Sequence, residues 1–89
     1  MNTETYLNHP TFGLLFRVCK VEEGQELFTT LYAQRLFFVV TTGSDGLSFE
    51  PITRSDARLL VENRLRLLRR TGPLDEFEAL KLLHHQTFQ

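Results

Sequence analysis

The chain has 89 residues, a formal net charge of −1 at pH 7 and 42% apolar side chains. Such a chain is long enough for one domain with a modest core, and its composition is typical of a folded protein rather than a disordered one. No apolar run reaches the ~20 residues of a membrane helix, and no secretory signal opens the chain, so we expect a cytoplasmic protein without membrane contact. The single cysteine, Cys19, excludes an internal disulfide and a cysteine zinc cluster.

The first half of the chain has the alternation and turn signals of β-strands. Strands are predicted over residues 12–21, 26–32, 36–42 and 47–52. The first alternates, with Leu14, Phe16 and Val18 on one face. The strand at 36–42 is apolar throughout, as expected for a strand covered on both faces, and an Asp-Gly hairpin signal follows it. We expect four or five short strands in a small, strongly bent antiparallel sheet or partly open barrel.

The second half of the chain has the signals of two helices. Thr53, with Asp56 three residues later, resembles a capping box that starts the first helix. The periodic stretch runs to Arg70, and a Gly-Pro pair then ends it. A second helix is predicted from about Leu74 to Thr87. The expected fold class is α+β, with a β domain over residues 1–53 and a two-helix extension over residues 54–89.

The predicted helices are amphipathic at a spacing of ~100° per residue. The apolar arc of the first helix contains Ala57, Leu60, Val61, Leu65, Leu67 and Leu68. The opposite arc contains Arg58, Glu62, Arg66, Arg69 and Arg70. On the second helix, one face contains Phe77, Leu80, Leu83, His84 and Phe88. Two residues break the pattern: Leu59 lies on the polar side, and Arg64 lies in the apolar arc, where its guanidinium must reach solvent or pair with a carboxylate.

The arginine face of the first helix is a candidate phosphate-binding surface. It could bind nucleic acid or a nucleotide, or it could be a solvated helix face paired with Glu62. Residues 54–89 carry seven basic and five acidic side chains, whereas residues 1–53 carry three basic and six acidic ones. The acidic first half and the overall charge of −1 argue against a nucleic-acid-binding protein.

Metal binding and catalysis find little support in the sequence. His84 and His85 are adjacent and diverge by about 100° on a helix, so they cannot both bind one metal from one face. We expect His84 to line the core, His85 to be solvated and His9 to lie in a turn. Cys19, expected in mid-strand, has no feature that would stabilise a thiolate. No phosphate-binding glycine loop and no Gly-x-Ser-x-Gly motif is present, and we expect neither an enzyme nor a cofactor.

Residues 32–38 form a candidate binding segment. They combine Tyr, Gln, Arg and two Phe, and Tyr and Arg are enriched in binding hot spots. On a strand, Phe37 and Phe38 face opposite sides. Either one of them lies outside the core and joins a binding surface, or both faces of this strand are covered.

Three long blocks of the chain resemble the PipX family, the PII-interacting proteins of cyanobacteria. They are YLNHPTFGLL at 6–15, ELFTTLYAQRLFF at 26–38 and DARLLVENRLR at 56–66, and the closing residues 87–89 also match. The resemblance implies a Tudor-like β domain followed by two helices, without enzymatic activity. It further implies an adaptor between the trimeric PII signalling protein and the dimeric transcription activator NtcA.

In the scheme that the resemblance implies, 2-oxoglutarate and ATP load PII, and 2-oxoglutarate loads NtcA. The adaptor then leaves PII and coactivates NtcA, and it returns to PII when 2-oxoglutarate is scarce. The PII complex can also engage a further regulator, PlmA. The contacts that the resemblance implies are Tyr6, Glu23, Tyr32, Gln34, Arg35, Leu36 and Phe38. A small nucleic-acid-binding domain that uses the arginine face is the alternative hypothesis.

Overall fold

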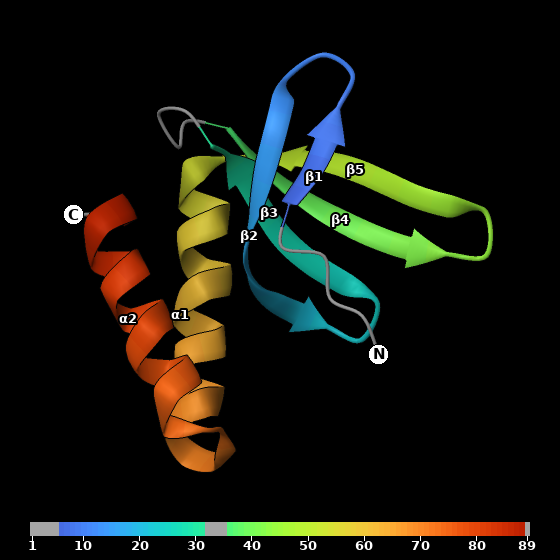
Figure 1. Cartoon of the computed structure of the whole chain (residues 1–89). Helices are drawn as coiled ribbons and strands as arrows, with labels where there is room; N and C mark the ends of the chain where they lie inside the picture. Colours follow the sequence, from blue (N-terminus) through green and yellow to red (C-terminus); the bar gives the residue numbers. More distant parts are fainter. Residues whose placement is uncertain (1–5, 32–35, 89) are drawn as a thin grey trace.

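The computed structural model describes residues 6–31 and 36–88. The strands are β1 (Tyr6–His9), β2 (Gly13–Glu22), β3 (Gln25–Thr30), β4 (Phe37–Gly43) and β5 (Gly46–Ile52). They form one antiparallel sheet in the order β1-β2-β3-β4-β5. The helices α1 (Arg54–Thr71) and α2 (Leu74–Phe88) follow and lie side by side on one side of the sheet (Figure 1). The α+β class, the bent antiparallel sheet and the two C-terminal helices are confirmed.

The sheet curls because β2 is irregular. Arg17 pairs with Phe28 and Cys19 with Leu27, so Val18 is an extra residue in a β-bulge. The register shifts a second time at Val21, between Lys20 and Glu22, so the strict alternation predicted for this strand fails at both valines. Such bulges increase the twist of a strand, and Figure 1 shows β1 and β2 standing across β3, β4 and β5.

The curl produces two separate hydrophobic cores, one on each face of the sheet. The core between the sheet and the helices contains Cys19, Leu27, Phe37, Ala57, Val61, Leu68, Leu80 and Phe88. The core inside the curled sheet contains Leu15, Phe28, Phe38 and Val40. Phe37 and Phe38 are both buried, on opposite faces of β4. The prediction that this strand is covered on both faces is confirmed.

The ends of α1 are formed as the sequence predicts. Thr53 is the N-cap, and its Oγ1 accepts a hydrogen bond from the Asp56 N–H at 3.0 Å. At the other end the Gly72 N–H donates to the Leu68 carbonyl at 2.9 Å. The apolar arc is narrower than predicted, because Leu67 is 41% exposed. No helix within the described ranges is long and apolar enough to cross a membrane.

Polar contacts connect α2 to α1. The Arg64 guanidinium, predicted to need a partner, donates to Glu76 Oε2 at 3.1 Å. His84 Nε2 lies 3.1 Å from Glu62 Oε2. At the C-terminal end the Arg54 side chain donates to the Thr87 carbonyl, and its guanidinium carbon lies 5.3 Å from the centre of the Phe88 ring. The second helix is thus placed by its apolar face and by charged pairs along its length.

Candidate protein-binding surface

The β1–β2 hairpin presents two exposed aromatic side chains. Tyr6, at the start of β1, is 52% exposed, and Phe12, in the turn, is 45% exposed. The turn is organised by His9, whose Nδ1 accepts hydrogen bonds from the backbone N–H groups of Thr11 at 3.0 Å and Phe12 at 3.3 Å. An acceptor Nδ1 carries no proton, so the turn requires the imidazole without a proton on this nitrogen. His9 closes β1 and places Phe12 outside the sheet.

A cluster of aromatic rings packs against this hairpin. The His9 ring lies 5.0 Å from Phe12, 5.6 Å from Phe38 and 5.1 Å from Phe49, measured between ring centres. Phe12 and Phe38 lie 5.5 Å apart. Phe38 is only 3% exposed, so it lies beneath the surface rather than on it. Phe38 was predicted to contact a partner. In this structure it lies against the exposed Phe12 ring and supports it.

Leu36 immediately precedes β4 and is 40% exposed. Its backbone is fixed by β3: the Leu36 carbonyl accepts from the Thr30 N–H at 3.1 Å and from Thr29 Oγ1 at 2.7 Å. The predicted contact residues Tyr32, Gln34 and Arg35 lie outside the described residues.

The strand register places the backbones of Tyr6 and Leu36 in the same zone of the sheet, but their side chains on opposite faces, because successive side chains of a strand alternate. Tyr6 pairs with Phe16, Phe16 with Thr29, and Thr29 with Phe37, the neighbour of Leu36. This row spans three strand spacings, or about 15 Å along the sheet.

Glu23 lies apart from this zone. It occupies the β2–β3 turn, six residues before Thr29, which is roughly 20 Å along the strand at ~3.3 Å per residue. Its carboxylate is 94% exposed and lies 3.1 Å from Lys20 Nζ. A contact through Glu23 therefore requires a partner that extends the full length of the β2–β3 hairpin.

Phe12 and His9 are the residues of this surface that the sequence did not single out as contacts. Phe12 was predicted as the first residue of the strand over residues 12–21, but it lies in the turn before β2, and no sequence signal indicated that its ring is exposed. We refer to the exposed side chains of Tyr6, Phe12 and Leu36 together as the sheet-edge apolar surface and keep this name below, although they lie at separate places on the sheet.

The arginine face of α1 is partly neutralised within the chain. Arg58 Nε donates to Glu62 Oε2 at 3.0 Å, and Arg66 donates to Asn63 Oδ1. The pKa of Glu62 is lowered, first by the hydrogen bond from Arg58 and then by that from His84. The interpretation of a solvated helix face paired with Glu62 is confirmed for Arg58. His84 is partly buried beside Glu62 and His85 is exposed, as predicted.

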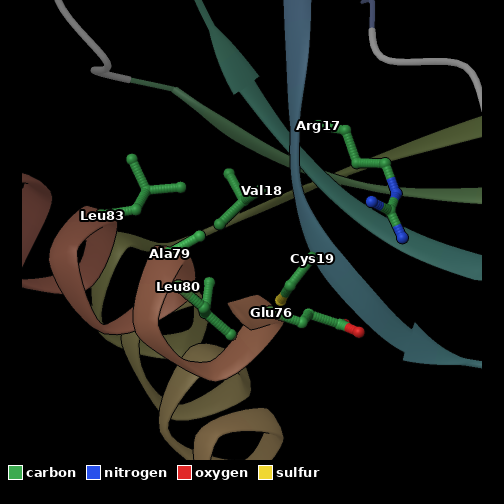
Figure 2. Close-up of a pocket in the computed structure, with 7 residues that line it drawn as sticks. All are labelled: Arg17, Val18, Cys19, Glu76, Ala79, Leu80 and Leu83. Atoms are coloured by element: carbon green, nitrogen blue, oxygen red, sulfur yellow. The ribbon is translucent and has the colours of Figure 1, made fainter. Parts of the chain in front are cut away.

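A pocket of about 270 Å³ lies between β2 and α2 (Figure 2). Its lining is mixed, with Cys19 and Val18 from the strand and Glu76, Ala79 and Leu80 from the helix. Burial raises the pKa of the Cys19 thiol from 9.0 to about 12, so the thiol stays protonated at neutral pH. A protonated, buried thiol is a poor nucleophile and a poor metal ligand. Among the described residues, no three His, Cys, Asp or Glu side chains are grouped so that they could hold a metal ion.

The structure defines a class of small α+β protein, with a curled antiparallel sheet that carries exposed apolar side chains and two C-terminal helices. The family model described as PipX, PII-interacting protein X, matches residues 3–88. The chain therefore belongs to the PipX family, which is a family of PII-interacting proteins rather than a known family of enzymes. No curated protein matches the chain.

Proposed function

We propose that this protein is a non-enzymatic adaptor that binds PII when 2-oxoglutarate is scarce and coactivates the transcription factor NtcA when it is abundant. Membership of a PII-interacting family supports the first partner. The observation that supports the proposal is the exposure of three apolar side chains of the β domain, since Tyr6, Phe12 and Leu36 are each at least 40% exposed. The partner-binding unit is then the β domain, residues 1–53, and the protein acts in the cytoplasm.

The exchange of partners has a simple physical form. If PII and NtcA use the same surface, they compete, and the effector need only change their relative affinities. A tenfold change in the affinity ratio requires about 1.4 kcal/mol of differential binding. In this proposal PII and NtcA bind 2-oxoglutarate, PII binds ATP or ADP, and the adaptor itself binds neither effector.

A pull-down on purified PII tests the proposal. The full chain should be captured by PII with ADP and released with ATP plus 2-oxoglutarate, and added NtcA with 2-oxoglutarate should then retain it. Failure of capture under both conditions would contradict the PII half of the proposal. Capture by PII without any binding to NtcA would contradict the coactivator half.

Variants of the sheet-edge apolar surface locate the contact. Tyr6→Ala and Phe12→Ala should each weaken PII binding about tenfold or more, because exposed aromatic anchors are frequent hot spots. Leu82→Ala is the matched control, since Leu82 is 58% exposed but lies on α2. Equal losses in all three variants would show that the surface is misplaced. Tyr32→Ala, chosen from the sequence, should weaken both complexes.

The contact with PlmA through the PII complex is a separate proposal. A pull-down on PlmA should capture the chain only when PII is present. The alternative function, nucleic-acid binding through the arginine face, is tested by a gel shift with random oligonucleotides. Tight binding by the protein alone that weakens with salt would revive this alternative.

A further inference from the structure

A groove of about 310 Å³ runs between α1 and α2. It is lined by Glu62, Leu65, Arg66 and Arg69 from α1 and by Phe77, Lys81 and His84 from α2. Its floor is apolar and its rim is basic. It lies on the helix pair, whereas the sheet-edge apolar surface lies on the strands.

Two cations from different helices each lie near the Phe77 ring in this groove. The Arg69 guanidinium carbon lies 5.8 Å, and Lys81 Nζ 5.9 Å, from the centre of the Phe77 ring. The negative face of the ring attracts each of them, but their like charges repel each other. Within the described ranges, neither side chain has a carboxylate within salt-bridge distance. The site therefore holds positive charge that the described part of the chain does not neutralise.

The carboxylate in the groove wall is already engaged. Glu62 Oε2 lies 3.0 Å from Arg58 Nε and 3.1 Å from His84 Nε2. Arg66 donates to the neutral amide of Asn63, which does not compensate its charge. Arg66, Arg69 and Lys81 together form a basic site that a negatively charged ligand would complete.

A second hollow, of about 540 Å³, adjoins the groove. It is lined by Asn63, Arg66, Leu67, Arg69 and Arg70. Arg66 and Arg69 line both hollows, so they form a basic ridge between them. Leu67 offers an exposed apolar side chain on one side of the ridge, and Phe77 and Leu65 offer an apolar floor on the other.

We propose that this basic groove binds an acidic peptide segment of a partner protein. Carboxylates of the segment lie against Arg66, Arg69 and Lys81, and apolar side chains that flank them enter the two hollows. Charge complementarity favours an anionic ligand on this rim, and the apolar floors favour a peptide. A phosphate backbone would place charge rather than apolar groups on both floors. The site is independent of the proposed exchange between PII and NtcA.

A titration of the isotope-labelled full chain tests this proposal. The probe is a synthetic peptide that repeats the unit Leu-Glu-Glu-Phe. Its binding is monitored by the amide chemical shifts of the protein and, with a fluorescently labelled peptide, by fluorescence anisotropy. The amides around Arg66, Arg69 and Phe77 should shift. A peptide with Gln in place of Glu, a peptide with Ser in place of Leu and Phe, and a single-stranded oligonucleotide serve as comparisons, and each should bind at least tenfold more weakly.

Variants distinguish the groove from other basic side chains. Arg69→Gln combined with Lys81→Gln should weaken binding of the peptide about tenfold, which corresponds to ~1.4 kcal/mol. Lys20→Gln removes a positive charge from the sheet and should leave the binding of the peptide unchanged. Equal binding of the Gln peptide, stronger binding of the oligonucleotide, or no shifts at these amides would overturn the proposal. Capture by PII should be unchanged in the double variant, so failure here and failure of the adaptor function are separable.

Discussion

Replacing Glu76 with alanine should destabilise the protein, because it removes the carboxylate that pairs with Arg64 between the two helices. The Arg64 side chain is 18% exposed and lies 3.1 Å from Glu76 Oε2. Its Nε is buried and has no hydrogen-bond partner among the described residues. Without Glu76 the guanidinium would keep the cost of its burial and lose the charge that offsets it.

The magnitude follows from the exposure of the two side chains. Breaking a fully buried ion pair costs ~3–5 kcal/mol, but the Glu76 side chain is 41% exposed, so solvent screens much of the interaction. We expect Glu76→Ala to lower the free energy of unfolding by about 1–2 kcal/mol. Arg64→Met removes the charge and keeps the apolar stem, so it should stay within about 1 kcal/mol of the wild type.

Denaturant unfolding followed by circular dichroism measures both variants and the double variant. Glu76 also lies in the first turn of α2, where a carboxylate stabilises the helix by ~0.5 kcal/mol. When Arg64→Met is already present, adding Glu76→Ala should therefore cost only about 0.5 kcal/mol. A loss on Arg64→Met as large as that on Glu76→Ala would refute the reasoning, because the pair would then be a net source of stability.

Three further predictions concern single positions. Thr53→Ala should lower the free energy of unfolding by about 1 kcal/mol through loss of the α1 cap, with Thr53→Ser as the conservative control, measured by thermal unfolding. Gly72→Ala should lower the free energy of unfolding by ~1–3 kcal/mol, because an added Cβ would lie 2.8 Å from Leu68 Cα. Gly43→Ala is the control and should lower it less, because its Cβ would lie 4.0 Å from the Gly46 carbonyl oxygen. The raised pKa of Cys19, about 12 against 9.0, means that the unfolded chain loses this proton first as pH rises. Stability should be full below pH 9.0 and fall by up to ~1.4 kcal/mol per pH unit toward pH 12, and the pH profile of Cys19→Ala should lack this decline.

The secondary structure could be predicted from the sequence because its signals are local. Hydrophobic period, the Thr53 cap and the break at Gly72 are all readable within a few residues, and both helices form where they indicate. The strand β1 was not predicted. It has four residues, and its side chains alternate only between exposed and half-buried, so it lacks the apolar alternation by which a strand is identified.

The curvature of the sheet could not be predicted in detail because it depends on extra residues in β2. The sequence of β2 alternates smoothly, and only pairing with β3 shows that Val18 and Val21 have no opposite residues. The extra residue at Val18 sends Leu15 into one core and Cys19 into the other. A pattern of period two describes the faces of a strand, but the register with the neighbouring strand decides which core each face meets.

The sequence predicts that Arg64 needs a carboxylate partner or solvent, but it does not predict which carboxylate. The position of Arg64 in an apolar arc requires a carboxylate or solvent, and this requirement is a property of one helix. Whether Glu76 or another acid supplies it depends on the offset between α1 and α2, which a helical wheel does not contain. The same holds for the basic groove, since Phe77 and Lys81 meet Arg69 only through helix packing.

The binding surface illustrates the same limit on function. Tyr6 and Leu36 are far apart in sequence, and only the strand register shows that their backbones share one zone of the sheet while their side chains lie on opposite faces. Phe12 is exposed because the Nδ1 of His9 accepts the two N–H groups of the turn, while Phe38 and Phe49 hold the His9 ring. A proton on Nδ1 would remove both hydrogen bonds to the turn, so the His9 imidazole helps to support the exposed Phe12 ring. The histidine that the sequence predicts only as a turn residue thus fixes the position of an aromatic group on the proposed partner surface.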